Sequence, residues 1–318
     1  MFEAGERLGL SVMAFTDHDS LPNDAHLAYL ESVRGSKMKW IIGTEITAGL
    51  PPEPGASRGG SFHIVGLFVN PKDPALLAHC EKSQAERIRF VRAVVVRLKE
   101  LGFEIEAEEC FALAGEGSVG KPHVAAILEK REANRNLIEA FRQKMAEDAR
   151  SDPATKEKYD TMMHYGPGGY PYALFLGRDA YIPVSSRYEY LLNMNDVVSL
   201  IHGAGGVASL AHYCTMRKKI SLDHLARLLE SQKIDALETV YRQKPYQPTE
   251  LPAIREEREA VKRIAFETGA LATGGPDAHS VPDIKSFLDA KDLAAETIGM
   301  TERIIASGKV NTLWSSFC

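Results

Sequence analysis

The sequence has no long apolar segment. Its 318 residues contain no run close to the roughly eighteen apolar residues that a membrane-spanning helix requires. The first residues also lack a basic segment followed by an apolar stretch and a small-residue cleavage site, which is the pattern of a secretory signal peptide. We therefore expect a cytoplasmic protein that has no membrane partner.

Paired cysteines and excess basic charge are also missing. The sequence has four cysteines, and none belongs to a Cys-x-x-Cys pair, which argues against a thiolate zinc site and a disulfide framework. It has 38 Lys and Arg residues against 43 Asp and Glu residues, with a formal net charge of -5 at pH 7. This balance gives no basic surface for long nucleic acid. A small anionic substrate is still compatible with it, because bound metal ions reverse the local field.

The chain does contain an alternation of strands and helices. Hydrophobic residues make up 44% of the sequence, and its length fits one barrel-sized domain or two smaller ones. Parallel strands joined by helical crossovers form an α/β barrel or an open α/β sheet. The expected strands fall into two groups, at 12–19, 39–43 and 62–69, and then at 206–211, 236–241 and 270–274.

The middle of the chain departs from this alternation. Between residues 104 and 193 the sequence becomes mostly helical and polar. We interpret 104–193 as an inserted subdomain that covers the mouth of a barrel. Residues 1–103 and 194–318 then form one discontinuous barrel domain of the α/β class.

Polar residues follow or lie within most of the expected strands. The carboxyl ends of the strands of an α/β barrel open on one face, so residues far apart in the sequence meet there. A single His at a strand end is more often structural, but imidazoles and carboxylates from five strand positions together predict a metal centre for Zn, Mn or Fe. Hydrolysis is the natural use of such a centre. The candidates are Asp17, His18, Asp19, Glu45, His63, His212, Asp277 and His279.

These candidates belong to six short motifs: Thr16-Asp17-His18-Asp19-Ser20, Gly43-Thr44-Glu45, His63-Ile64-Val65-Gly66, Gly120-Lys121-Pro122-His123, Leu210-Ala211-His212 and Gly275-x-Asp277-x-His279. In this order they resemble the motifs of the PHP (polymerase and histidinol phosphatase) family. The likeness is closest to bacterial PHP phosphoesterases that act on nucleotides. It covers nearly the whole chain and is weakest across residues 129–172.

The resemblance implies a distorted (β/α)7 barrel with a small inserted domain and up to three divalent ions, Mn, Zn or Fe, at its mouth. Matched motif by motif, Glu45, His63 and His212 would hold one ion. Glu45 would bridge to a second ion, which Asp277 would also bind.

The same resemblance assigns the remaining candidates. His18 and His279 would hold a third ion. A metal-bound hydroxide between the ions would attack phosphorus, so that no nucleophilic side chain is needed. Asp17 and Asp19 would support this step by orienting the ligands, since ligating histidines need their other ring nitrogen held in place.

Two departures from the family pattern affect these expectations. The first strand of the family ends in His-x-His, followed shortly by an Asp or a His, and the printed sequence has no such segment. We therefore expect a barrel that lacks its first strand, with one complete ion site and two partial ones. Lys121 stands where the family commonly has Arg. Lys121 and His123 would bind the substrate phosphate at a helix start, or are a surface Lys and a helix-start His without that role.

The sequence thus predicts a metal-dependent phosphoesterase that hydrolyses a small phosphate ester, such as a nucleotide or a short oligonucleotide end. One alternative is a degenerate PHP domain that binds a metal or nucleotide without turning it over. Another is a metal-dependent amidohydrolase, which shares the barrel and the ligand chemistry. The sequence leaves open the metal, the general acid and the oligomeric state.

Overall fold

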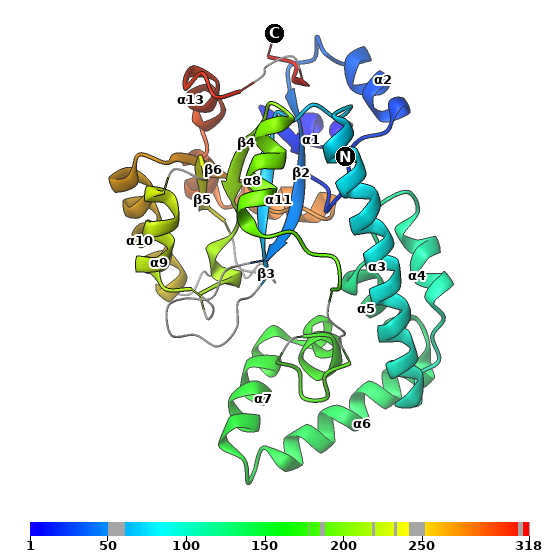
Figure 1. The fold of residues 1–318 in the computed structure, drawn as a ribbon. Helices are drawn as coiled ribbons and strands as arrows, with labels where there is room; N and C mark the ends of the chain where they lie inside the picture. Colours follow the sequence, from blue (N-terminus) through cyan, green and yellow to red (C-terminus); the bar gives the residue numbers. More distant parts are fainter. Residues whose placement is uncertain are drawn as a thin grey trace. The chain divides into compact units, whose positions relative to one another are not determined.

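The computed structural model describes residues 1–49, 61–177, 179–184, 188–217, 220–231, 234–241, 252–310 and 314–317. The chain divides into two compact units (Figure 1). The first, here called the sheet unit, is Met1–Glu81 with Leu191–Cys318, and the second, the helical unit, is Lys82–Tyr190. The limits 104–193 for the insert, and its place over the barrel mouth, stay predictions.

The sheet unit contains one six-stranded sheet in which the strands follow their order in the sequence. It curls as part of a barrel would, and the complete seven-stranded barrel stays a prediction (Figure 1). The strands are β1 (Val12–Phe15), β2 (Lys39–Gly49), β3 (Ser61–Leu67), β4 (Val207–Leu210), β5 (Ala236–Val240) and β6 (Leu271–Gly274).

The direction of β3 corrects the expectation of parallel strands throughout. β1 and β2 are parallel, as are β4, β5 and β6, but β3 is antiparallel to both of its neighbours. A parallel connection needs a crossover of about a dozen or more residues that is usually helical. The linker 50–60, rich in Pro and Gly, is too short for one, and it lies outside the described residues.

One face of the sheet changes from apolar to polar along its strands. Ile41, Leu67, Val207 and Ala236 belong to one buried cluster on this face. The strand register places polar residues further along the same face, namely Glu45, His63, Ser209, Glu238 and Thr273. Because β3 is reversed, its amino end lies beside the carboxyl ends of the other strands, and His63 therefore reaches the polar end.

The opposite face of the sheet packs against helices. Trp40, Ile42, Ile46 and Ile64 point to this side and are 2% exposed or less, so that each contributes roughly 1.5–3 kcal/mol by burial. Their cluster includes side chains of α1 (Phe2–Arg7), α2 (Asp24–Ser32), α8 (Met194–Gly203), α9 (Leu222–Glu230) and α10 (Pro252–Thr268). The unit also contains α11 (Val281–Asp289), α12 (Lys291–Ala295) and α13 (Met300–Ala306).

Side-chain caps fix where several of these helices begin. The oxygens of Asn23, Asn193 and Ser221 accept hydrogen bonds from backbone N–H groups in the first turns of α2, α8 and α9. Each such cap is worth about 1 kcal/mol, because it satisfies an N–H group that has no partner within the helix. The residue pattern predicts helices over 22–34 and 195–203, and α2 and α8 correspond to them.

The helical unit has an aromatic core of its own. Phe175 is fully buried, and its ring meets those of Phe103 and Phe141 edge to face, with centroids 5.1 and 5.2 Å apart. The long helix α3 (Pro74–Glu100) has residues in both units. The spacing of apolar residues predicts a helix only from Glu86 onward, and α3 begins twelve residues earlier. The remaining helices are α4 (Ala107–Ala114), α5 (Lys121–Lys130), α6 (Glu132–Asp148) and α7 (Pro153–Tyr165), with the short turns Pro167–Gly169 and Tyr172–Leu176.

None of the helices in the described part of the chain has the length and apolar character needed to span a bilayer.

A buried carboxylate lies at the amino end of β5. Asp235 accepts hydrogen bonds from the backbone N–H of Ala208 at 3.0 Å and from Nε2 of His202 at 2.6 Å. Nζ of Lys309 donates to its other oxygen at 3.1 Å. Burial by itself would raise the pKa of Asp235, but these donors outweigh it and hold the pKa below its usual value.

Asp235→Asn should lower the free energy of unfolding of the sheet unit by about 1–3 kcal/mol at pH 7, because several donors lose a charged acceptor. A depressed pKa in the folded state means that this stabilisation is present above about pH 4 and is lost as the pH falls through the folded pKa. The difference between native protein and variant should therefore shrink between pH 5 and pH 3. Denaturation followed by tryptophan fluorescence measures it, since Trp40 and Trp314 both belong to the sheet unit.

Asp24→Asn is the matched control, because the Asp24 side chain is 90% exposed and its change should have little effect at any pH. A difference between the Asp235 variant and the native protein that stays constant from pH 7 to pH 3 would contradict the assignment.

Candidate metal centre

Three residues from neighbouring segments meet at the polar end of the sheet. Glu45 belongs to β2, His63 to β3, and His18 to the segment that follows β1. This segment continues alongside β2: the Glu45 N–H donates to the Asp17 carbonyl at 3.1 Å, and the Asp19 N–H donates to the Glu45 carbonyl at 2.9 Å. His18 is thereby held directly beside Glu45.

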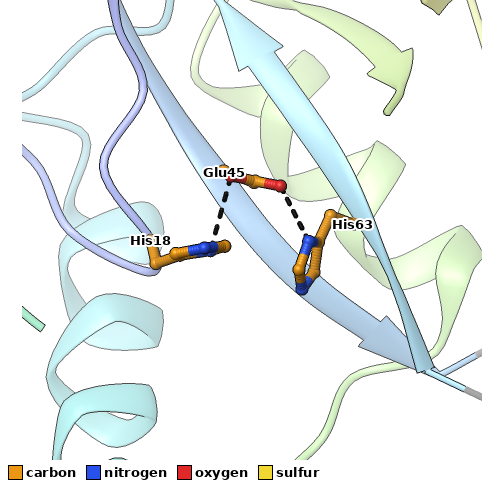
Figure 2. Close-up of side chains that lie close together, drawn as sticks. All are labelled: His18, Glu45 and His63. Atoms are coloured by element: carbon orange, nitrogen blue, oxygen red, sulfur yellow. Dashed lines mark ion pairs between the residues drawn. The ribbon is translucent and has the colours of Figure 1, made fainter. Parts of the chain in front are cut away.

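The two imidazoles approach the Glu45 carboxylate from different sides (Figure 2). Nδ1 of His63 lies 2.7 Å from Oε1 of Glu45, and Nδ1 of His18 lies 3.5 Å from Oε2. One ligand atom from each of the three residues lies within 4.8 Å of the others, so the group could hold a metal ion. The carboxylate is buried, whereas both rings keep about 30% of their surface exposed, and the group therefore remains open to solvent on one side.

His212 adds a third imidazole to the same carboxylate. It follows β4, and its Nε2 lies 3.0 Å from Oε1 of Glu45 and 3.4 Å from Nδ1 of His63. The backbone N–H of Ala211 donates to the His63 carbonyl at 3.1 Å, which extends the pairing of β3 and β4 up to the site. The structure thus brings together His18, Glu45, His63 and His212, four of the six predicted ligands.

The electrostatics of the group favour a bound cation. Burial alone would raise the pKa of Glu45, but the charges of His18 and His63 and hydrogen bonds from His212 and His63 hold it well below its usual value. Burial alone would lower the pKa of His212, whereas the hydrogen bond and charge of Glu45 raise it to about 9. An ionised carboxylate surrounded by imidazole nitrogens is a donor set that Zn, Mn and Fe accept. The residues present therefore fit a divalent ion.

The two predicted ligands after β6 lie beside this group. The ring centroids of His279 and His18 are 6.1 Å apart, and the charge of Asp277 contributes to the raised pKa of His212. Nδ1 of His279 lies 2.9 Å from the Asp277 carbonyl oxygen. Within the described residues, the compact set of donor atoms comprises His18, Glu45 and His63 and does not extend to Asp277 or His279. The ligand roles of Asp277 and His279 stay predictions.

The two acids that flank His18 act differently from each other. Asp17 contributes its backbone carbonyl, which accepts from the Glu45 N–H and from Oγ1 of Thr44. Asp19 is 2% exposed, and its carboxylate accepts from the N–H of Thr47 at 3.1 Å and from its Oγ1 at 3.2 Å. Asp19 therefore ties the segment that carries His18 to β2.

Backbone strain is concentrated at this end of the sheet. Among the described residues other than glycine, positive φ angles occur at Asp19 (45°), Phe68 (61°), His212 (21°) and Asp277 (47°). Such conformations cost about 1–3 kcal/mol each and persist where the surroundings enforce them, often at functional sites. Three of these four residues are candidates from the sequence.

Lys121 and His123 belong to the helical unit, at the start of α5. Nδ1 of His123 accepts a hydrogen bond from the backbone N–H of Gly120 at 3.1 Å, so this ring caps the helix. Nζ of Lys121 lies 5.8 Å from the centroid of the Phe90 ring. A role for Lys121 and His123 in binding substrate phosphate stays a prediction.

Glu238 was not among the residues selected from the sequence. It lies in β5, and its Oε2 accepts a hydrogen bond from the backbone N–H of His212 at 2.5 Å. Burial, together with the charges of Asp277 and Glu45, raises its pKa to about 7 despite the opposing effect of His212. A signal was present in the sequence, because Glu238 is an acid in the middle of the apolar run 236–240.

Comparisons with known proteins agree with the fold. No protein-family model matches the chain, and no curated protein matches it. A candidate metal-dependent phosphoesterase from Bifidobacterium adolescentis is 22% identical, with a TM-score of 0.60 over 87% of this chain and 80% of that one. An amidohydrolase from Chromobacterium violaceum, solved with sulfate and without metal, is 18% identical, with a TM-score of 0.59 over 92% of this chain and 88% of that one. At these identities the similarity concerns the fold.

Proposed function

We propose that this chain is a metal-dependent hydrolase of the PHP type that cleaves a small phosphate ester, such as a nucleotide or the end of a short oligonucleotide. The observation that carries the proposal is the Glu45 carboxylate with the imidazoles of His18, His63 and His212 within 3.5 Å of it. The fold similarity to a candidate phosphoesterase and the ordered sequence motifs support it.

The residues of the site have separate roles in this proposal. Glu45, His63 and His212 would hold a divalent ion, with His18 on the other side of the carboxylate. A bound ion would supply Lewis acidity and lower the pKa of water to near neutrality. Asp19 keeps His18 in place through its two hydrogen bonds to Thr47.

A tetrahedral anion is the ligand that this centre is proposed to take. The Chromobacterium violaceum protein of similar fold binds sulfate, which has the shape and charge of a phosphate group. The overall charge of -5 does not oppose a small phosphate ester, since ions held near Glu45 would dominate the field at the site.

His63→Ala and Asp277→Ala should each reduce divalent-metal content and phosphatase activity together, with a loss of metal affinity of about 100-fold or more for His63→Ala, because it removes a ligand rather than a supporting group. Metal content is measured by elemental analysis after dialysis, and activity with nucleoside monophosphates and a generic phosphate ester. His26→Ala is the matched control, because His26 lies exposed on α2.

Full retention of metal and activity in both variants would refute the proposed function. Metal binding without turnover of any phosphate ester would favour the non-catalytic alternative.

The amidohydrolase reaction is a second candidate, because one of the two proteins of similar fold carries that description. An imidazole and carboxylate centre can polarise a carbonyl as well as a phosphoryl oxygen. Assays with matched amide and phosphate-ester substrates separate the two reactions. A clear preference for amides would replace the phosphoesterase proposal.

A further inference from the structure

The backbone of His212 has a conformation that is unusual for a residue other than glycine. It has φ 21° and ψ 74°, outside the conformation of the strand that precedes it. The pairing of β4 with β5 ends at Leu210 and Leu237, so the N–H of His212 lies beyond the last pair of the ladder. This N–H therefore needs a hydrogen-bond acceptor other than the backbone of β5.

The side chain of Glu238 does so. Its Oε2 accepts from the His212 N–H at 2.5 Å, where a backbone carbonyl of β5 would accept in a continuing ladder. A carboxyl oxygen can accept this bond whether the group is ionised or protonated on its other oxygen. The β5 carboxylate thus fixes the direction in which the His212 side chain leaves the backbone.

Thr215 holds the ring of the same histidine. This residue ends the short turn Tyr213–Thr215, and its N–H donates to the His212 carbonyl at 3.0 Å. Its Oγ1 lies 3.2 Å from the same carbonyl and 3.2 Å from Nδ1 of His212. A hydroxyl that donates to the carbonyl accepts from Nδ1–H, so Nδ1 would keep its proton when Nε2 gives up its own to bind a metal ion.

The two contacts have one combined effect. With the backbone fixed and the proton on Nδ1, Nε2 faces Oε1 of Glu45, 3.0 Å away, to which it donates a hydrogen bond in the metal-free protein, and Nδ1 of His63, 3.4 Å away. A metal-ligating imidazole binds the ion through the lone pair of one nitrogen, while the N–H of its other nitrogen donates to a fixed acceptor.

We propose that Glu238 and Thr215 are the positioning residues of His212: Glu238 fixes its backbone through the N–H, and Thr215 holds a proton on Nδ1, so that Nε2 is the nitrogen presented to a divalent ion. The inference rests on the proposed metal centre for its purpose. The hydrogen bonds themselves exist without the ion, and they can be tested in the metal-free protein.

The first test reads the Nδ1–H of His212 without metal. Ring N–H NMR signals are recorded near pH 7 in native protein, Thr215→Ser and Thr215→Val. The Ser variant keeps the hydroxyl and should keep the Nδ1–H signal. The Val variant has the same shape without the hydroxyl, so its Nδ1–H should shift and exchange faster with water. An unchanged Nδ1–H signal in the Val variant would overturn the role of Thr215.

A control variant separates this effect from a general loosening of the strand. Ser209→Ala removes the buried hydrogen bond between Ser209 and Thr273, which are 2.7 Å apart on β4 and β6. It should leave the His212 ring shifts as they are in the native protein. A shift equal to that of Thr215→Val would overturn the proposal, because the Nδ1–H of His212 would then respond to any loosening of β4.

The second test compares Glu238→Gln with Glu238→Leu. Gln retains an oxygen that accepts from the His212 N–H, whereas Leu does not. Titration calorimetry with MnCl2 and ZnCl2 should show affinity close to native for the Gln variant and a roughly 10- to 100-fold loss for the Leu variant. Equal losses in both variants would overturn the positioning role, because Glu238 would then act through its charge.

The hydrogen-exchange rate of the His212 backbone N–H tests the role of Glu238 without metal and without the Leu variant. The exchange rate should stay near native in Glu238→Gln and rise at least about tenfold in Glu238→Ala, since the N–H loses its acceptor. A native protein that binds no metal would defeat the proposed function alone. Unchanged exchange in the Ala variant would defeat the positioning role of Glu238 alone.

Discussion

Glu45→Gln should abolish tight binding of divalent metal and, with it, hydrolysis. Among the described residues, Glu45 is the carboxylate that His18, His63 and His212 all approach, at 3.5, 2.7 and 3.0 Å. Its replacement removes the negative charge and keeps the shape. The expected loss of affinity exceeds about 100-fold, which is the upper end of the effect of losing a group that only orients a ligand. Calorimetric titration with MnCl2 and ZnCl2 measures it.

The same variant makes a prediction that is independent of metal. The negative charge and hydrogen bond of Glu45 raise the pKa of His212 to about 9 in the metal-free protein. Without that charge, burial predominates, and the pKa of His212 should fall below its native value. An NMR titration of the imidazole measures the change, with His26 as the exposed internal reference. A His212 pKa that does not fall would contradict the geometry of the centre.

Phe175→Ala should give the largest loss of stability in the helical unit, about 3–5 kcal/mol. The ring is fully buried and packs edge to face against Phe103 and Phe141, so truncation leaves a cavity and removes both aromatic contacts. Hydrogen exchange read by mass spectrometry across α6 measures the effect, because it reports on this unit separately from the sheet unit. Protection of α6 should decrease strongly in the variant.

Phe266→Ala is the control for this experiment. Phe266 lies on α10 and is 87% exposed, so its removal should change stability by less than about 0.5 kcal/mol. Equal effects of the two substitutions would show that the packing around Phe175 does not stabilise the helical unit.

The expected strands were largely predictable, because each is a short apolar run bounded by polar or turn residues. The direction of β3 was not, since the alternation of side chains has period two and reads the same in either direction. His63 lies within a strand, as its sequence context predicts. Its nearness to Glu45 depends on the reversal of β3, which pairs His63 with Thr47, two residues from Glu45 on the same face of β2. The local sequence pattern therefore predicts where the strands lie, but it does not predict whether neighbouring strands are parallel or antiparallel.

The candidate site was predictable to a similar degree. His18, Glu45 and His212 could be selected because each follows or ends an apolar run, and the structure places them together. Glu238 could not be selected by the same rule, since its importance comes from the N–H of a residue on another strand. The contribution of Asp17 was also hidden, because it acts through its carbonyl oxygen, and a sequence does not distinguish backbone groups.

The reversal of β3 has a consequence for how this protein can diversify. Gly49 and Ser61 are paired across β2 and β3 at the same end of the sheet as His63 and Glu45. An insertion or deletion between Gly49 and Ser61 therefore keeps the register of β2 and β3, and with it the spacing of Glu45 and His63. Related proteins can differ in length between these two residues without moving either side chain.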